Sequence, residues 1–483
     1  MKTKNKYEVF LDYLGRHFGL SEFRLAPVVV GACAMLVTVL IAAGNASINA
    51  SDKDPRPVIG IVILALLVHG LFALLRSGKF LKRELRNSES YLLSILICVY
   101  LSGAILIRRF FPSLDGLMVS MAIPTALVIM ISAVFMGSRM TLALAIVLPL
   151  GSYLCGAFDL AALTFALVSA AAASVVIKNA EKRMDLIKAG LIIAAANCIA
   201  VVVVLLLRRS GLQGYPRALF WAALNGIASG MLVLGFLPPL EQALNSATVF
   251  RLMELSDLNA PILRRLFTTA PGTYSHSIMV ANLAEQACQD IGANALLARV
   301  GAYYHDLGKM ENPEYFVENQ TDYNRHDDMA PRLSATVIRS HVKLGVEKAR
   351  SLKLPQELIE IIGEHHGNSI IAWFYDKASR QESQVKSDDF TYPGVPPRSK
   401  ESAVVMLADV TEAAVRTLVK PNAAKMERFI QQLFEDKERN GQLADSALSF
   451  RDLETIKKAF VKVLAGYYHS RIEYPDQKKE AGE

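Results

Sequence analysis

The sequence has only five cysteines among 483 residues, and no two of them form a C-x-x-C pair. Four lie inside apolar runs: Cys33, Cys98, Cys155 and Cys198. A cysteine in such surroundings behaves as a small hydrophobic side chain. We therefore expect neither a disulfide framework nor a thiolate metal site in this chain.

Charge is scarce in the first 240 residues. Hydrophobic residues make up 52% of the whole chain, which is high for a soluble protein. Eight apolar runs are candidate membrane spans, at residues 25–48, 58–75, 90–107, 114–136, 140–157, 160–178, 187–207 and 219–240. The first run is longer than the apolar core of a signal peptide, so we predict a retained spanning helix with the N-terminus in the cytoplasm.

The Lys and Arg residues between these runs predict the orientation of the membrane domain. Fourteen lie on the side of the N-terminus and seven on the opposite side. An excess of basic residues in short loops marks the cytoplasmic side of a membrane. Eight spans return the chain to the cytoplasm near Glu241, where a soluble catalytic domain is expected.

Acidic residues are missing from the interiors of the spans, and this disfavours a transporter. His69 is the one ionisable residue well inside a run, and no neighbouring run supplies an acidic partner for it. The net charge of +7 suggests nucleic acid at first sight, but the basic residues of the first half are concentrated in short loops and not on one amphipathic face. We therefore expect a lipid bilayer as a partner and no nucleic-acid polymer.

The composition changes at about Glu241, where charges become frequent and apolar residues take helical spacing. Strand-like alternation is nearly absent, so the predicted fold class is all-α: a polytopic helical membrane domain followed by a cytoplasmic all-helical domain. Helices are predicted near residues 274–290, 294–305, 334–352, 355–366, 401–418, 422–437 and 450–467, and a polar loop is predicted over 377–400. The predicted divisions are 1–24 cytoplasmic segment, 25–240 membrane domain, 241–260 connecting helix, 261–470 catalytic domain and 471–483 disordered tail.

The segment from Thr248 to Leu258 has the pattern of an amphipathic helix. Such a helix could transmit movement from the membrane domain or pair with a second copy of the chain, which leaves a homodimer open. The alternative is a spacer that packs on the catalytic domain.

The second half contains histidines and aspartates in a pattern typical of metal sites. The clearest string is YHDLGK at residues 304–309, in which His305 and Asp306 offer an imidazole nitrogen and a carboxylate oxygen from adjacent positions. The other candidate ligands are His276, His341, His365, His366 and Asp409. Five of the nine histidines of the chain belong to this set, and their wide spacing predicts that they come from several helices.

Seven ligands suffice for two metal ions, which need roughly three protein ligands each and a shared carboxylate. Such a pair of ions activates water and neutralises a phosphodiester. Asp306 is the expected bridging residue, because it can direct both oxygens inward. Imidazole and carboxylate ligands without thiolate favour iron or manganese, with zinc next and magnesium last.

Each ligand has a simpler explanation that must be weighed. A lone histidine is more often a core or surface residue, which is our interpretation of His17, His326 and His469. Asp409 ends an apolar run, where a carboxylate is costly without a cation to meet it. Lys309 follows His305 by four residues and could contact a substrate phosphate, although it could equally be a solvated surface lysine.

The motifs resemble those of one family, the HD-domain phosphohydrolases that are fused to a seven-transmembrane receptor module. The resemblance runs from about residue 112 to 475 and is most specific in the strings LFTTAPGTYSHS, AYYHDLGK, VENQ, IRSHV, EHHG and AD. It implies hydrolysis of cyclic di-AMP to the linear dinucleotide pApA at a di-iron or di-manganese centre, in a bacterial inner or plasma membrane. It also implies that His276, His305 and Asp409 hold one metal, that His341, His365 and His366 hold the other, and that Asp306 and Lys309 act in catalysis.

The chain departs from the family pattern in three places. Members usually carry a large extracytoplasmic domain after the first span, whereas residues 49–57 occupy that place here. Met310 and Glu311 stand where basic character is expected before a proline, and Asn368 replaces the more usual threonine. Without that domain we do not expect the chain to sense an external ligand in the usual way. The last two changes leave the ligands intact but could shift the substrate preference or the rate.

The alternatives from the sequence are an HD phosphodiesterase for another cyclic dinucleotide or nucleotide, and a catalytically silent membrane receptor that binds a nucleotide. The intact set of ligands argues against a silent receptor, because binding alone does not require seven of them.

Overall fold

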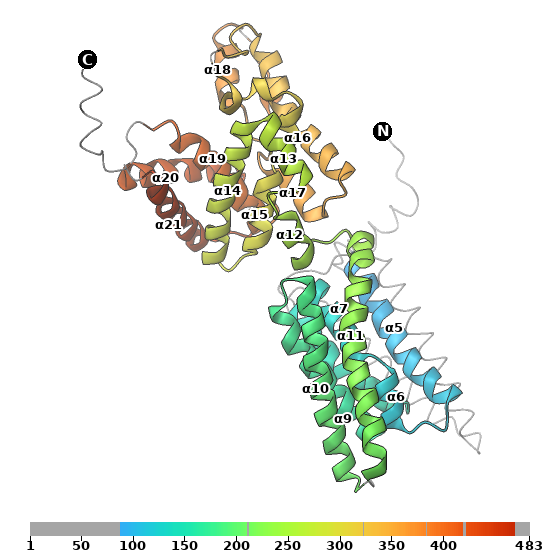
Figure 1. Cartoon of the computed structure of the whole chain (residues 1–483). Helices are drawn as coiled ribbons and strands as arrows, with labels where there is room; N and C mark the ends of the chain where they lie inside the picture. Colours follow the sequence, from blue (N-terminus) through green and yellow to red (C-terminus); the bar gives the residue numbers. More distant parts are fainter. Residues whose placement is uncertain (1–86, 210–211, 322, 383, 419–421, 469–483) are drawn as a thin grey trace, which may run out of the picture. The chain divides into compact units, whose positions relative to one another are not determined.

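The computed structural model describes residues 87–209, 212–321, 323–382, 384–418 and 422–468, and within these residues the fold is helical (Figure 1). It has no β-strand there, and one isolated antiparallel bridge joins Ile370 to Thr391. The chain divides into two compact units, Met1–Leu244 and Asn245–Glu483. The all-α prediction is confirmed.

The described part of the first unit is made of apolar helices. They are α5 (Asn87–Phe110), α6 (Gly116–Ala122), α7 (Thr125–Met136), α8 (Ser138–Leu154), α9 (Leu160–Val176), α10 (Arg183–Leu207) and α11 (Tyr215–Leu244), with short 3-10 turns η1 (Ile177–Asn179) and η2 (Leu212–Gly214). Among the described residues, four helices are long and apolar enough to cross a membrane, and the bent pair α6 and α7 makes a fifth if it counts as one span. The predicted spans at 25–48 and 58–75 lie outside the described residues.

Two of the predicted spans differ from simple helices. The run at 114–136 breaks at Pro124 into α6 and α7, which are bent by 43°. Proline lacks the backbone N–H and disfavours helix at the preceding residue, so this break follows from the sequence. The run at 140–157 forms α8, whose 17 residues extend for roughly 25 Å, less than the hydrocarbon core of a bilayer.

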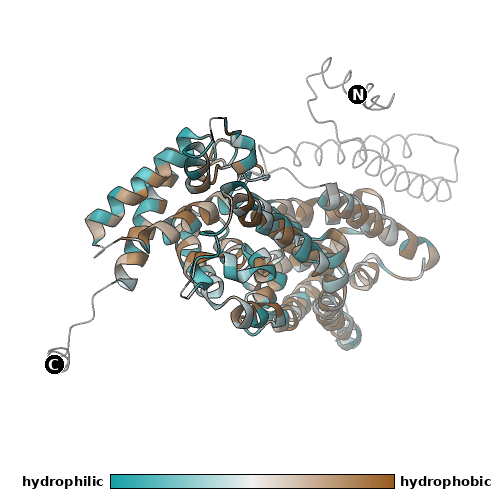
Figure 2. Cartoon of the chain, turned by 90° about the horizontal axis from the view of Figure 1, so that it is seen from above, coloured by the Kyte–Doolittle hydropathy of each residue, from teal (hydrophilic) through white to brown (hydrophobic). Residues whose placement is uncertain are grey.

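The second unit has an amphipathic pattern, with hydrophilic and hydrophobic residues alternating along its helices (Figure 2). Its elements are α12 (Val249–Leu255), α13 (Pro261–Thr269), α14 (Pro271–Asp290), α15 (Ala295–Tyr304), η3 (Leu307–Glu311), η4 (Pro313–Tyr315), η5 (Val317–Asn319), α16 (Pro331–Ser351), α17 (Gln356–Glu364), α18 (Ala372–Ser379), η6 (Ser387–Phe390), α19 (Lys400–Val415), α20 (Ala423–Arg439) and α21 (Phe450–Tyr467). Within the predicted amphipathic segment 248–258, the structure has the seven residues of α12, and Thr248 caps its N-terminus.

Helix α19 lies at the centre of this unit. Residues 403–408 are all buried, so the helix is apolar on every side over this stretch. Ser399 caps its N-terminus by accepting a hydrogen bond from the backbone N–H of Ser402. It packs against α14, α15, α17 and α20, and this buried position brings Asp409 into the interior of the domain.

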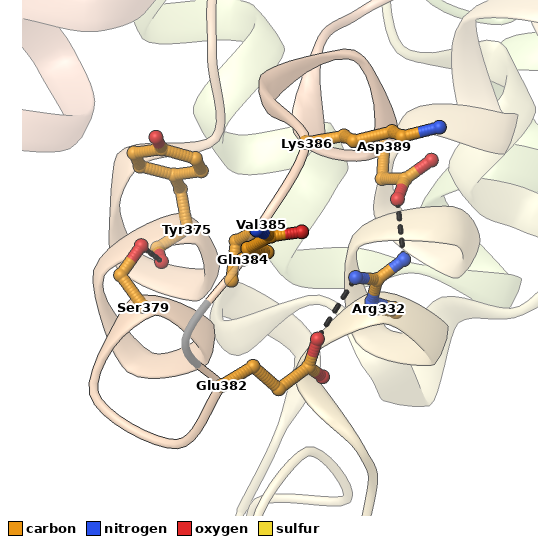
Figure 3. Close-up of a pocket in the computed structure, with 8 residues that line it drawn as sticks. All are labelled: Arg332, Tyr375, Ser379, Glu382, Gln384, Val385, Lys386 and Asp389. Atoms are coloured by element: carbon orange, nitrogen blue, oxygen red, sulfur yellow. Dashed lines mark hydrogen bonds and ion pairs between the residues drawn. The ribbon is translucent and has the colours of Figure 1, made fainter.

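The predicted loop over 377–400 is tied to the domain. Residues 372–379 form α18, and the Phe390 side chain is fully buried. The guanidinium of Arg332 in α16 pairs with Glu382 at 2.8 Å and with Asp389 at 2.5 Å (Figure 3). The loop therefore has defined anchors that its polar composition did not predict.

Candidate metal centre

The seven predicted ligands come together from five helices, mostly at helix ends. His276 lies in α14, His305 caps the end of α15, and Asp306 precedes η3. The others lie in or directly after three more helices: His341 in α16, His365 and His366 after α17, and Asp409 in α19. Six of the seven residues are buried, and His366 is partly exposed. We call these seven residues the His/Asp cluster.

Asp306 is at the centre of the cluster and directs its two oxygens to different histidines. Its Oδ2 lies 3.1 Å from His305 Nε2 and 3.8 Å from His276 Nε2. Its Oδ1 lies 3.4 Å from His341 Nε2 and 3.7 Å from His365 Nε2. This is the arrangement that a carboxylate shared between two cations requires.

Three of the histidines have a defined tautomer. The Nδ1 atoms of His305, His341 and His365 lie 2.6–2.7 Å from the backbone carbonyl oxygens of Ala302, Ile338 and Ile362, three residues earlier in each case. A carbonyl oxygen only accepts, so each Nδ1 carries the proton and donates it. Each Nε2 then presents a lone pair to the interior, which is the state in which histidine binds a metal.

The interior of the cluster holds lone pairs without donors to match them. His341 Nε2 and His365 Nε2 lie 3.2 Å apart, and both carry lone pairs when Nδ1 is protonated. His305 Nε2 and Asp306 Oδ1 are buried without a hydrogen-bond partner among the described residues, while Asp306 Oδ2 faces the Nζ of Lys309 at 2.8 Å. Buried polar atoms of this kind are costly unless a cation satisfies them. The residues present therefore fit a metal.

The pKa shifts of three histidines in the cluster disfavour a proton as the cation that satisfies these buried lone pairs. Burial, followed by the charge of His305, lowers the pKa of His365 to about 3, and burial lowers the pKa of His341 and His366 as well. Burial alone would raise the pKa of Asp306, but His305 and Lys309 hold it well below its usual range. At neutral pH His341, His365 and His366 thus offer neutral imidazoles and Asp306 offers an ionised carboxylate, which are the ligand forms that metals need.

The ligand atoms fall into overlapping groups, each within 4.8 Å of one another. One group is His341, His365 and His366; a second is His276, His305 and Asp306; a third is His305, His365 and Asp409. The first group has the same members as one of the two predicted metal sites. His305 is shared by the other two groups, so the division of the remaining ligands between two metals stays a prediction.

Glu412 contacts the cluster and was not among the residues that the sequence interpretation singled out. Its Oε2 lies 2.5 Å from His276 Nδ1, while His276 Nε2 lies 3.0 Å from Asp409 Oδ1. Burial disfavours a charged ring here, but the hydrogen bonds to Asp409 and Glu412 raise the pKa of His276 to about 9. Glu412 follows Asp409 by three residues, so the same helical face gave a signal that could have identified it.

We expect Glu412→Gln to weaken metal binding by about 10- to 100-fold, because an amide orients the His276 ring without the full charge of a carboxylate. The apparent affinity is measured from activity against free Mn²⁺ concentration and from competition with a chelating dye. Glu435→Gln, which changes an exposed glutamate of α20, is the control. Equal metal affinities for both variants would remove the positioning role from Glu412.

Lys309 lies beside the cluster on η3, which begins directly after Asp306. Its Nζ lies 2.8 Å from Asp306 Oδ2 and donates to Glu318 Oε1 at 2.8 Å. Burial alone would lower the pKa of Lys309, but Asp306 and Glu318 raise it above its usual value. The lysine is therefore charged, and one of its three hydrogens remains to donate to a further acceptor.

Gly308 explains how η3 reaches α16. A Cβ at Gly308 would lie 1.9 Å from the carbonyl oxygen of His341 and 2.6 Å from the backbone nitrogen of Gly345. Only glycine allows this approach of two backbones, which brings Asp306 next to His341.

We expect Gly308→Ala to destabilise the protein by about 3 kcal/mol or more, because the clash is with backbone atoms that cannot move independently. Thermal unfolding followed by protein fluorescence measures the effect. Gly466→Ala in α21 is the control, since no heavy atom lies within 4 Å of its added Cβ and alanine favours a helix. An unfolding midpoint for Gly308→Ala equal to that of Gly466→Ala contradicts the close approach.

A cavity of about 490 Å³ opens on the His/Asp cluster and is lined by residues from α14, η3, α16, α19 and α20. The Tyr392 ring covers one side of it and stacks on His366, with ring centroids 4.3 Å apart. Its volume lies in the range of small-molecule sites. We call it the cluster cavity.

A second cavity, of about 670 Å³, lies between α16, α18 and the loop before η6 (Figure 3). It contains none of the His/Asp cluster, and Arg332 there is already paired with Glu382 and Asp389. The size of this cavity is therefore no argument for placing the chemistry in it.

An all-helical domain with this buried centre defines the class of HD-domain proteins. Residues 273–414 match the family model for the HD domain, and this range includes all seven cluster residues. HD domains bind divalent metals, in agreement with the fit described above.

The membrane unit specifies the family further. Residues 55–248 match the model described as a 7TM receptor with intracellular HD hydrolase. The chain is 36% identical over 437 residues to the cyclic-di-AMP phosphodiesterase PgpH of Bacillus subtilis. The aligned region covers 88% of this chain and 61% of that protein. It is 38% identical over 317 residues to PgpH of Listeria monocytogenes. This aligned region covers 65% of this chain and 44% of that protein. The chain belongs to the family of seven-transmembrane receptors with an intracellular HD hydrolase domain.

The chain is also similar to solved structures of an HD domain. The crystal structure of the L. monocytogenes PgpH HD domain in complex with cyclic di-AMP is 42% identical, covers 44% of this chain and all of that one, and has a TM-score of 0.43. The chain spans about three fifths of the Bacillus relative and less than half of the Listeria relative.

Proposed function

We propose that this membrane protein is a metal-dependent phosphodiesterase that hydrolyses cyclic di-AMP to pApA and so lowers a bacterial second messenger. The observation that carries the proposal is the Asp306 carboxylate, which is buried among histidine nitrogens beside an open cavity and whose Oδ1 has no hydrogen-bond partner among the described residues. The substrate is supported by two of the relatives, the PgpH proteins of Bacillus subtilis and Listeria monocytogenes, which are both named cyclic-di-AMP phosphodiesterases.

The residues that would hold two metals are His276, His305 and Asp409 on one side, and His341, His365 and His366 on the other, with Asp306 between them. When bound, two such ions activate water and neutralise the oxygens of a phosphodiester. Ligands of imidazole and carboxylate without thiolate favour iron or manganese.

The side chains around the cluster prepare it for this chemistry. The carbonyl oxygens of Ala302, Ile338 and Ile362 hold three imidazoles in the tautomer that exposes Nε2. Lys309 is held by Asp306 and Glu318 and has one hydrogen left to donate to a phosphate oxygen. We propose that Lys309 orients the reacting phosphate by this hydrogen bond and stabilises its negative charge.

The proposed location is a bacterial inner or plasma membrane, with the catalytic unit in the cytoplasm. The support is the excess of Lys and Arg on the side of the N-terminus, together with the apolar helices of the first unit. We propose the domain limits 25–240 for the membrane domain, 241–260 for the connecting segment and 261–470 for the catalytic domain. An enzyme in this place meets an intracellular messenger by diffusion.

The test is a panel of cyclic dinucleotides with the full-length protein in detergent, loaded with Mn²⁺. We expect kcat/KM for cyclic di-AMP to be at least about tenfold higher than for cyclic di-GMP, because a pocket that hydrogen-bonds one base leaves polar groups unpaired against another. A higher value for cyclic di-GMP would change the proposed substrate and leave the reaction class intact.

A further inference from the structure

Three long cationic side chains line the cluster cavity: Lys309, Arg416 and Lys437. Two of them are already neutralised by carboxylates. Lys309 pairs with Asp306 and Glu318, and Arg416 pairs with Glu412. Lys437 differs, because no carboxylate of the described residues lies within ion-pair distance of its Nζ.

Lys437 is held toward the cavity by one neutral hydrogen bond. It lies in the last turn of α20, and its Nζ donates to the hydroxyl of Ser369 at 3.0 Å. Two of its three hydrogens therefore remain for another acceptor. Burial lowers the pKa of Lys437, which means that the charged ammonium lacks the stabilisation that water or an anion gives.

The turn that carries Ser369 is itself fixed in place. Gln442, just after α20, donates to Asn368 Oδ1 at 2.7 Å and accepts from the Asn368 backbone N–H at 3.3 Å. Gly367 has a φ of +54°, and a Cβ there would lie 2.1 Å from Gln442 Oε1. The turn after His365 and His366 is thus clamped to the end of α20, so Lys437 keeps a defined position relative to the His/Asp cluster.

The proposed substrate has a second phosphate, which a cation on another wall of the cluster cavity could bind. A cyclic dinucleotide carries two phosphates in one ring, and only one of them can react at the His/Asp cluster at a time. Lys309 touches Asp306 and so belongs to the reacting phosphate. Lys437 reaches the same cavity from α20, a different wall.

We infer that Lys437 receives the second, non-reacting phosphate of a cyclic dinucleotide and thereby selects substrates that carry two phosphates. This inference rests on the proposed function. Lys437 is then a specificity-determining residue that contributes to substrate binding, while the chemistry of the reacting phosphate does not depend on it.

The experiment compares two ligands that share both adenosines and differ in the number of phosphates. One is cyclic di-AMP as substrate, and the other is the dinucleoside monophosphate ApA as a competitive ligand. The full-length protein is assayed as wild type, Lys437→Met and Lys437→Arg. Arg439→Ala is the control, because it removes an exposed cation two residues away on the same helix.

We expect Lys437→Met to raise KM for cyclic di-AMP by about 10- to 100-fold, the range for a lost hydrogen bond to a charged group. The kcat value should stay within about threefold and the inhibition constant of ApA within about twofold. Lys437→Arg should restore most of the affinity, and Arg439→Ala should behave as wild type.

The experiment distinguishes a failure of the inference on Lys437 from a failure of the proposed function. If the wild type turns over cyclic di-AMP and Lys437→Met has an unchanged KM, or loses both ligands equally, the inference is overturned while the proposed function stands. If the wild type binds two metals and hydrolyses no cyclic dinucleotide, the proposed function is overturned and this inference with it.

Discussion

Replacing Asp306 by asparagine or alanine is expected to reduce kcat for cyclic di-AMP by at least about 10³-fold, the scale on which removal of a central catalytic group acts. Its two oxygens face His305 and His276 on one side and His341 and His365 on the other. Asp409 also reaches both sides, since its Oδ1 lies 3.0 Å from His276 Nε2 and its Oδ2 lies 3.5 Å from His366 Nδ1, but Asp306 faces two histidines on each side. The loss should therefore appear in kcat together with a fall in metal content, measured by elemental analysis of the same samples.

Asparagine separates charge from shape in this experiment, because it keeps the volume of Asp306 and removes its charge. We expect the helical content of the Asp306→Asn variant, measured by circular dichroism, to match that of the wild type while turnover is lost. Asp290→Ala, at the exposed end of α14, is the control and should keep full activity. An Asp306→Asn variant with a near-normal rate and two metals per chain refutes the bridging role.

Removal of metal is expected to abolish turnover and to lower the midpoint of thermal unfolding by about 5 °C or more. A metal present at 100 times its dissociation constant stabilises a folded site by about 2.7 kcal/mol, which corresponds to several degrees for a domain of this size. The physical reason is the pair of lone pairs on His341 and His365, 3.2 Å apart, which repel each other without a cation. Fluorescence-monitored unfolding before and after chelation measures the shift.

Readdition of metal identifies the ion that the site prefers. We expect Fe²⁺ or Mn²⁺ to restore both activity and the unfolding midpoint, and Mg²⁺ to restore less, because imidazole ligands suit transition metals. Asp306→Asn is the control here, since chelation should shift its midpoint by much less than that of wild type. Full activity after exhaustive chelation would rule out metal dependence.

The seven candidate ligands could be singled out from the sequence because they lie in local motifs with strong physical costs. Asp409 stood out at the end of an apolar run, where an ionised carboxylate requires a partner. Adjacent His365 and His366 stood out because such a pair rarely serves packing. The structure brings both to the same cluster as His305 and Asp306.

What the sequence did not predict depends on contacts between distant segments. Lys437 occupies the charged last turn of an ordinary amphipathic helix, and nothing local indicates that Ser369 will meet it. The polar loop near 377–400 carries no sign that Arg332 anchors it. Tyr392 belongs to the same loop, and only the fold places its ring on His366.

In the fold, too, the features with a local sequence signal could be predicted, and those that depend on tertiary contacts could not. Helix periods placed α14, α16 and α21 to within a few residues, because their apolar faces are long and regular. The break between α6 and α7 was signalled by Pro124, but its 43° bend depends on the packing around it. The 3-10 turns after His305 were missed, since the close approach of Gly308 to α16 is a tertiary contact.

The most direct test of the account is to incubate the full-length, metal-loaded protein with cyclic di-AMP and to identify the product by chromatography and mass. The account predicts multiple turnovers to pApA by a preparation that holds about two transition metals per chain. A preparation with that metal content that leaves cyclic di-AMP and every other cyclic dinucleotide intact would contradict it.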